Sequence, residues 1–305
     1  MSGHIDHPAE PATPVPGLRR WLGFALVTVV LWGLWGAFTG ESIARGFPET
    51  LIYVVWSLVM IPPALFILAR NGWRLDTTPV AIGLGMAIGL LGAGGQLVLF
   101  HATTVGPAYL IFPLIALSPV VTIALSIGVL RERTTRLGWA GIVLALLALP
   151  LFDFAPGEAD GGLGWFVLAL VVMLCWGVQA FVMKFANGRM DAPSIFTYMT
   201  IAGLILAPVA WAMTDWSRPV NWNWDGPGLA AGIQLLNAVG ALTLVFAFRY
   251  GKAIVVAPLT NAGAPLVTAL LALAIAGVVP GPTKILALVL AFAAAVLLAF
   301  TSEQE

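Results

Sequence analysis

Residues 119–125 read PVVTIAL and residues 265–271 read PLVTALL, so that a proline, a valine, a threonine and the final leucine coincide. A second pair lies earlier in each copy, where residues 31–33 read LWG and residues 175–177 read CWG. In each pair, the second member follows the first after almost the same number of residues. One short match is weak, but two at a common spacing predict an internal repeat and a fold of two similar halves.

The composition defines the class of protein. The chain has 305 residues, of which 60% are hydrophobic and 9% are charged, whereas soluble globular proteins carry about 25% charged residues. The mean hydropathy is +0.98. These values exclude a soluble enzyme, a disordered regulator and a basic nucleic-acid binder, and they predict a polytopic protein of the lipid bilayer. A single cysteine, Cys175, excludes a disulfide framework and a cysteine-based zinc cluster, and we expect no metal or cofactor.

The apolar stretches predict the number of spans. A bilayer core about 30 Å thick needs roughly 20 apolar residues per helix. The sequence offers ten stretches, of which the fifth is short: 21–40, 51–69, 80–101, 107–129, 137–152, 163–185, 194–214, 227–249, 254–278 and 284–301. They lack the period-two alternation of membrane barrels. We therefore expect an all-α polytopic membrane protein with ten transmembrane helices.

The charged residues fit this layout and orient it. Every acidic residue falls in a terminus, a loop or a helix end, away from mid-membrane, where a charge costs about 2.5–3.5 kcal/mol. With the N-terminus inside, the opposite side holds only Arg45, Arg218 and Lys284, and the cytoplasmic side holds Arg19, Arg20, Arg70, Arg74, Arg131, Arg133, Arg136, Lys184, Arg189, Arg249 and Lys252. This bias predicts a multi-pass protein of the plasma (bacterial inner) membrane with both termini cytoplasmic.

The repeat and the spans together divide the chain. We expect a disordered cytoplasmic tail at 1–18, a first five-helix repeat at 19–152, a connecting loop at 153–162, a second five-helix repeat at 163–302 and a cytoplasmic end at 303–305. Since five is odd, the second half enters the membrane with the opposite topology. Inverted repeats are typical of transporters whose substrate site lies between the repeats near the midplane.

Prolines occur in pairs at corresponding places of the two halves. Pro113 and Pro119 fall in the fourth predicted span, and Pro258 and Pro265 fall in the ninth. Each proline removes an N–H and frees a carbonyl one turn earlier. Paired interruptions of this kind predict helix breaks that line a binding site. The alternative is that proline is simply more frequent in membrane helices than in soluble ones.

Residues 104–149 carry a resemblance to a known family. They contain a short turn, a helix with Ser118-Pro119-Val120, the segment Leu130-Arg131-Glu132-Arg133-Thr134-Thr135 and a Gly-Trp-Ala-Gly helix start. With a Trp-Gly near the start of each half, the chain resembles the drug/metabolite transporter superfamily, EamA-like branch. The resemblance implies a ten-helix permease that moves small metabolites, mostly outward.

One departure from the family pattern concerns an acidic residue at a helix end. The first half has Glu132 at this place, whereas the matching region of the second half reads AGVVP at 276–280, with no acid. We expect Glu132 to act structurally, by pairing with neighbouring arginines or by capping a helix, and to do so in one half only.

Uncharged polar and aromatic residues within the spans are the candidates for a substrate pathway. Residues spaced three apart share a helix face, as do Trp32 with Trp35, Trp176 with Gln179 and Gln234 with Asn237. The complete candidate set is Trp32, Trp35, Gln96, Tyr109, Trp176, Gln179, Gln234, Asn237 and Asn261. The alternative for the amides is that they join helices, at about 0.6 kcal/mol each, and for the tryptophans that they lie in the interfacial belt.

The functional hypothesis is a carrier for a small organic metabolite that works by alternating access. An amino-acid or amphipathic, aromatic substrate and export are favoured. Uptake of a nucleoside, sugar or related nutrient is the alternative, and a structural or lipid-handling role is a distant one. No nucleophile–base pair or metal cluster indicates an enzyme. His101 is the one candidate for gating or protonation, and a monomer or a homodimer fits the sequence equally well.

The loop at 212–226 leaves a further choice open. It carries Trp216, Trp222 and Trp224. Tryptophans at this depth most often lie in the interfacial aromatic belt. A lid over the substrate site is the alternative.

Overall fold

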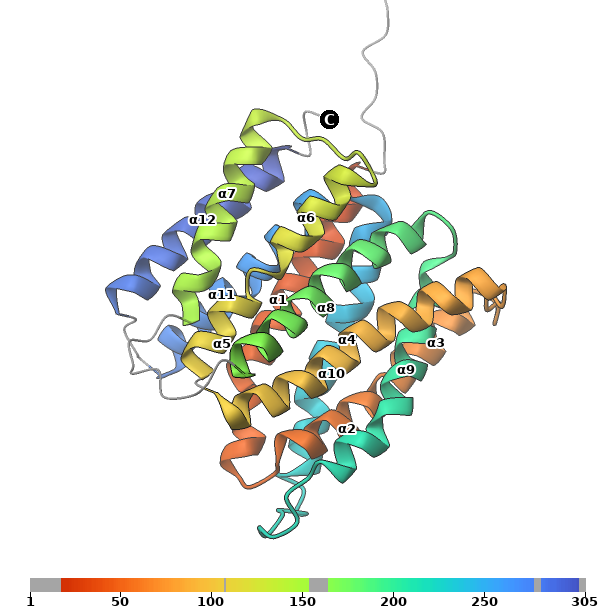
Figure 1. Ribbon diagram of the computed structural model, residues 1–305, viewed down its shortest axis with the longest axis vertical. Coiled ribbons are helices and arrows are strands. Elements are labelled where there is room, and N and C mark those ends of the chain that lie inside the picture. Colours follow the sequence, from red (N-terminus) through yellow and green to blue (C-terminus); the bar gives the residue numbers. More distant parts are fainter. Residues whose placement is uncertain (1–17, 107, 154–163, 277–280, 302–305) are drawn as a thin grey trace, which may run out of the picture.

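The computed structural model describes residues 18–106, 108–153, 164–276 and 281–301, and every regular element in these ranges is an α-helix (Figure 1). The helices are α1 (Leu18–Ala44), α2 (Glu49–Val59), α3 (Ile61–Arg70), α4 (Pro79–Val105), α5 (Ala108–Ile115), α6 (Ser118–Gly128), α7 (Arg136–Asp153), α8 (Gly164–Asn187), α9 (Ala192–Ala212), α10 (Pro227–Tyr250), α11 (Ala253–Ala276) and α12 (Pro282–Thr301). The predicted all-α class is confirmed, while the tail at 1–17 and most of the connecting loop lie outside the described residues.

Within the described ranges, 7 apolar segments are long enough to cross a membrane. They correspond to α1, α2 with α3, α4, α8, α9, α10 and the first part of α11. Three shorter apolar helices, Ser118–Gly128, Arg136–Leu151 and Pro282–Leu298, fall within the fourth, fifth and tenth predicted spans. The protein is therefore a multi-pass membrane protein.

Two of the predicted spans are divided in the structure. The second consists of α2 and α3, which meet at Met60, and Pro62 and Pro63 stand in the first turn of α3. Proline lacks the N–H that would continue the preceding helix. The fourth consists of α5 and α6, which are separated at residues 116–117, and Pro119 stands in the first turn of α6. Pro113 lies inside α5, so it does not make this break.

The expected break of the ninth span is not observed. Helix α11 runs without interruption through Pro258 and Pro265. Side-chain donors lie close to both prolines: Asn261 donates to the Ala257 carbonyl at 2.9 Å, and Thr268 donates to the Ala264 carbonyl at 3.1 Å. These are not the carbonyls that the prolines free, which belong to Ile254 and Asn261, four residues earlier. Proline is tolerated inside a membrane helix where neighbouring groups satisfy such freed carbonyls. The two halves are therefore not identical at their proline helices.

The halves are interlocked rather than placed side by side. Helix α1 of the first half packs against α10 and α11 of the second, and α8 of the second half packs against α4, α5 and α6 of the first. The corresponding outer helices pair with one another, α7 with α12 and α2 with α9. Figure 1 shows α7 and α12 side by side at one edge of the bundle and α3 and α9 at the other. Each half thus completes the packing of its partner.

The repeated motifs meet across this interface. The Thr268 hydroxyl donates to the Gly33 carbonyl at 2.9 Å, and the Thr122 hydroxyl donates to the Gly177 carbonyl at the same distance. A Cβ added at Gly177 would lie 2.5 Å from Cβ of Val121, and one added at Gly33 would overlap Val267. The Trp-Gly motif of each half therefore contacts the Pro-x-Val-Thr motif of the other half.

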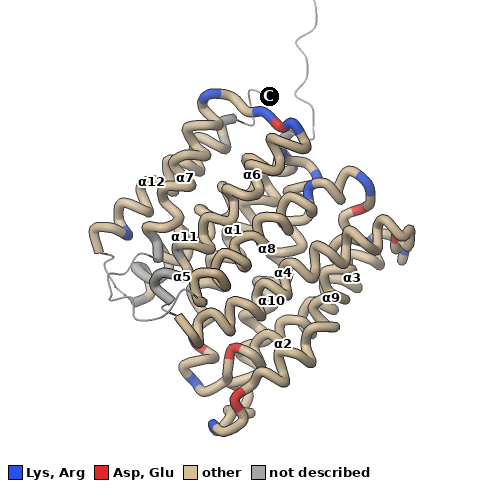
Figure 2. The backbone as a smooth tube through the Cα atoms, in the orientation of Figure 1, with Lys and Arg blue, Asp and Glu red and all other residues tan. Residues whose placement is uncertain are grey.

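Charged side chains mark the two ends of the bundle. The α3–α4, α6–α7, α8–α9 and α10–α11 connections lie at one end, since Lys252 bonds to Arg133, Arg249 to Met190 and Asn71 to Asp191. Figure 2 shows Lys and Arg gathered at this end, which we call the basic face. The α1–α2 and α9–α10 connections meet at the other end, which we call the opposite face.

The close contact at Gly33 yields a test of the packing. We expect Gly33→Ala to lower the free energy of unfolding by about 1–3 kcal/mol, because the added methyl group overlaps the side chain of Val267. Gly23→Ala on the same helix is the matched control, since nothing lies within 4 Å of its added Cβ. Denaturation of the purified variants in detergent measures the difference, and equal stability of the two variants would contradict the contact.

Candidate functional site

The first cluster of candidate residues lies between α1 and α10. The indole Nε1 of Trp32 donates to the Asn237 carbonyl at 3.3 Å. The same ring covers Gly240, where an added Cβ would lie 2.5 Å from Cδ1 of Trp32. Because glycine has no side chain, the Nε1 edge of the indole ring can approach the α10 backbone closely at this point.

One turn further along α1, Trp35 makes a side-chain contact with the same helix. Its indole Nε1 donates to Oε1 of Gln234 at 3.2 Å. Gln234 is only 4% exposed, so this bond satisfies a buried amide that would otherwise be costly. Trp32, Trp35, Gln234 and Asn237 thus form one continuous α1–α10 cluster.

The second cluster occupies the equivalent place between α8 and α4. The indole Nε1 of Trp176 donates to the Gly92 carbonyl at 3.2 Å. A Cβ added at Gly95 would lie 2.7 Å from the same nitrogen, and Gln179 packs against Gly92. The geometry matches that of Trp32, which also bonds to a carbonyl of the facing helix and covers a glycine three residues later. The sequence repeat is therefore also a repeat of contacts.

The two clusters differ in how their amides are used. Gln234 is bonded to Trp35, but Gln96, Gln179 and the Asn237 side chain are half-buried. Among the described residues these three side chains make no hydrogen bond to another protein group. Half-buried amides without protein partners are available to a polar solute or to water.

The electrostatics of this interface are neutral. The ion pairs found in the described ranges, Glu41–Arg45 and Asp215–Arg218, lie at the opposite face, and each joins residues close together in the sequence. The described carboxylates lie at helix ends or in connections. The two clusters between the halves therefore offer indole rings, amides and backbone groups rather than formal charges.

The remaining candidates are placed differently. Asn261 lies in α11 and uses its amide nitrogen on the Ala257 carbonyl of its own helix. His101 lies in the last turns of α4 and is exposed. Tyr109 and Pro113 belong to α5, but their side chains lie outside the described residues. The structure therefore does not join Asn261 or His101 to the two clusters by a hydrogen bond among the described residues, and the parts of Tyr109 and Pro113 stay predictions.

Sequence reasoning missed several residues of the interface. The hydroxyls of Thr28 and Thr243 are hydrogen-bonded at 2.8 Å, and Thr28 also donates to the Gly240 carbonyl at 3.2 Å. Glycines such as Gly92, Gly95 and Gly240, on which tryptophan or glutamine side chains rest, were also missed. A signal existed, because Gly95 and Gly240 occupy equivalent positions of the repeat.

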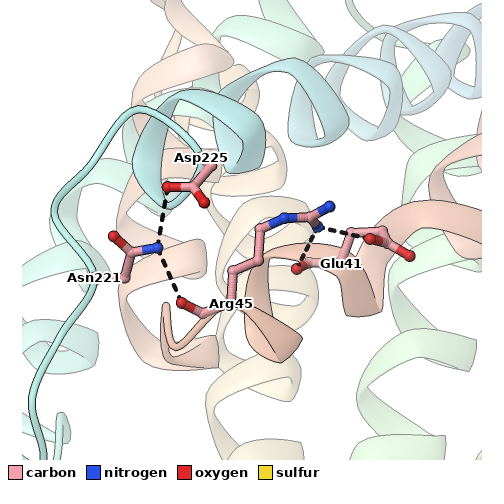
Figure 3. Close-up of polar contacts among 4 residues, drawn as sticks. All are labelled: Glu41, Arg45, Asn221 and Asp225. Carbon is pink, nitrogen blue, oxygen red and sulfur yellow. Dashed lines mark hydrogen bonds and ion pairs between the residues drawn. The ribbon is translucent and has the colours of Figure 1, made fainter.

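Polar contacts join the halves at the opposite face (Figure 3). The amide nitrogen of Asn221 donates to the Arg45 carbonyl at 2.9 Å and to Asp225 at 3.2 Å. Arg45 in turn forms an ion pair with Glu41 at 2.6 Å. Nearby, hydrogen bonds from the hydroxyl and backbone N–H of Ser217 lower the pKa of Asp215. The α9–α10 loop is thus attached to the end of α1.

Tryptophans cluster on the same loop. The rings of Trp211 and Trp216 have centroids 4.8 Å apart, and Trp222 packs against Trp211 and edge-on against Phe47. Trp224 is 85% exposed. This position, beside the end of α9 and away from the two clusters, favours the interfacial belt over a lid.

These features define a multi-pass helical membrane protein with two interlocked repeats and a neutral, indole- and amide-bearing interface. Residues 19–152 and residues 163–300 each match the model of the EamA-like transporter family. The chain belongs to this family, which indicates a membrane transporter.

Individual relatives agree with this assignment. The chain is 25% identical to Protein RarD of Streptomyces exfoliatus, over 76% of this chain and 71% of that protein. It is 28% identical to an uncharacterized protein of Methanocaldococcus jannaschii, over 43% of this chain and 93% of that protein. A crystal structure with 16% identity shares the fold with a TM-score of 0.76, covering 94% of this chain and 98% of the other.

The Trp35–Gln234 bond can be measured by a double-mutant cycle. We expect Trp35→Phe and Gln234→Leu to be coupled by about 0.6 kcal/mol, the average found for hydrogen bonds between membrane helices, and by no more than about 1.7 kcal/mol. Unfolding of the two single variants and the double variant in detergent gives this value. Additive effects of the two substitutions would show that the bond contributes nothing.

Proposed function

We propose that this protein is a carrier that moves a small organic solute by alternating access, with the solute held between the α1–α10 and α4–α8 clusters. The observation that carries the proposal is the duplicated tryptophan contact, made once by each half on the other. Two similar arrangements on either side of one interface allow the halves to exchange conformations. One cluster can then open toward one face while the other closes.

The proposed membrane topology has ten spans, in which the two halves are inverted relative to each other. It is supported by the seven long apolar segments, the three shorter apolar helices and the alternation of connections between the two faces. The basic face is proposed to be cytoplasmic in a bacterial plasma membrane, because positive residues are retained on that side. Transport is then proposed to run outward, from the basic face to the opposite face.

The proposed substrate is an amino acid or another amphipathic, preferably aromatic, metabolite. Trp32 and Trp176 offer ring faces, and Gln96, Gln179 and Asn237 offer amide groups that are not used by the described protein. The break before α6 adds a helix N-terminus inside the bundle, and the Ser118 carbonyl lies beside Gly177. A helix N-terminus inside a membrane protein favours anionic groups of a substrate. The carboxylate of an amino acid is such a group.

Reconstituted protein tests the proposal directly. We expect proteoliposomes to take up or exchange a member of an amino-acid and aromatic-metabolite panel, and Gln96→Leu and Gln179→Leu each to lower the initial rate by about tenfold, because a lost hydrogen bond in a dry site costs about 1–3 kcal/mol. Thr197→Val is the control, since that hydroxyl bonds only to the Pro193 carbonyl of its own helix. Before these assays, a thermal-shift screen can narrow the panel, because a bound solute raises the apparent stability.

Two results would reject this proposal at different levels. The absence of flux for every solute in both directions would reject the carrier function. If the Gln96→Leu and Gln179→Leu variants transport solute as fast as the Thr197→Val control, the assignment of the site is rejected and the carrier function is kept.

Proton coupling is not part of the proposed mechanism. Proton relays in membranes use interior ionisable groups, and His101 is exposed near a helix end. We therefore expect His101→Gln to leave the ratio of fluxes at pH 6 and pH 8 unchanged within about twofold. A pH-dependent flux that this substitution abolishes would instead show that His101 takes part in coupling.

A further inference from the structure

Two connections from different halves meet at the basic face. The carboxylate Oε2 of Glu132, between α6 and α7, accepts a hydrogen bond from the backbone N–H of Ile254 at 3.1 Å. In the same place, the ammonium of Lys252 donates to the Arg133 carbonyl at 2.9 Å. These two bonds run in opposite directions between the α6–α7 and α10–α11 connections, and we call them together the basic-face latch.

The backbone presents Glu132 in a defined direction. Arg131 has a φ of 55°, in the left-handed region that residues with a side chain seldom adopt. The next N–H, that of Glu132, donates back to the Ser126 carbonyl at 3.1 Å. A strained residue persists only where the surrounding contacts require it. The connection is therefore folded over the end of α6, with Glu132 directed to the other half.

The α10–α11 connection is also held from its other side. The ammonium of Lys184 in α8 donates to the Phe248 carbonyl at 3.1 Å and to the Gly251 carbonyl at 2.5 Å. A cation at the C-terminal end of α10 and a carboxylate at the N-terminal end of α11 both match the helix dipoles. Lys184 belongs to the same half as this connection, whereas Glu132 belongs to the other. Separation of the halves at this face would therefore break the latch and leave the Lys184 bonds intact.

Helix α11 is more deeply buried at the basic face, where the latch lies, than at its other end. The five residues 253–257 at the basic face are each less than 5% exposed. At the other end of the helix, Leu270 is 51% exposed and Ile275 is 66% exposed. The part of α11 that follows the latch is thus enclosed, and access to it from the basic face requires the latch to open.

At this connection, only the first half has a carboxylate that can form a contact like that of Glu132. No aspartate or glutamate lies between Asp225 and Glu303, so the corresponding connection of the second half has no carboxylate to place on the first. The inverted halves are alike in their tryptophan contacts but unlike in this bond. The corresponding connection of the second half therefore makes no carboxylate contact of this kind on the first.

We propose that Glu132 and Lys252 hold the transporter closed at the basic face and must release it in each cycle before solute can enter from that side. This inference rests on the proposed alternating access, and it adds the contact that regulates it. Glu132 acts as a positioning residue here, because it touches the other half and not the solute.

Labelling of a buried cysteine measures the opening without any substrate. Ala257 is 1% exposed and lies one turn beyond Ile254. The reporter is Ala257→Cys in a Cys175→Ser background, which removes the single native cysteine. A membrane-impermeant charged maleimide is applied from the basic face to vesicles of known orientation. We expect Glu132→Ala to raise the labelling rate about fivefold, the effect of losing one helix-capping bond, and Glu132→Gln to raise it less.

Glu41→Ala is the matched control, because Glu41 pairs with Arg45 of the same half, just after the end of α1 at the opposite face (Figure 3). It should leave the labelling rate unchanged. Lys252→Ala removes the other bond of the latch, and it replaces Glu132→Ala in the labelling experiment if Glu132→Ala does not fold. An unchanged rate in the folded latch variants, or an equal rise in Glu41→Ala, would overturn the proposal.

The two proposals fail separately in this design. If no solute is transported but labelling responds to the latch variants, the transport function fails and the latch stands. If solute is transported and labelling does not respond, the latch fails alone.

Discussion

The close approach of helices from opposite halves at Gly33 and Gly177 is the constraint on which the rest of the structure depends. At each glycine, the backbone carbonyl accepts a bond from a threonine of the facing half, and a side chain would overlap a valine. In lipid, helices gain little from the hydrophobic effect on meeting, so packing of this kind holds them together. Because each half supplies one motif of each pair, neither half can complete these contacts alone.

This interlocking also places the polar groups. A tryptophan directly precedes each of the two glycines, so bringing the glycine against one helix brings the indole against the next. The indole N–H then finds a carbonyl of the facing helix, while Gln96 and Gln179 remain unused by the described protein. Tight packing at one point thus creates a neutral polar surface beside it.

The two halves depart from symmetry at two places. Helix α11 is continuous, whereas the corresponding span of the first half is divided into α5 and α6. Glu132 reaches across to α11 without an acidic counterpart in the second half. The two halves therefore differ both in the continuity of one helix and in one contact between them.

The sequence by itself determined the helical membrane class, the approximate spans and the repeat, because apolar length and helix hydrogen bonding are local properties. It also selected Trp32, Trp176 and Gln234 as candidates for the substrate pathway; the structure places them between the halves, and their part in a pathway stays a prediction. Only the tertiary structure decided that α1 meets α10, that α11 continues through its prolines and that Glu132 caps Ile254. The first and last of these outcomes join residues far apart in the chain, and all three depend on which surfaces fit together, which no local pattern records.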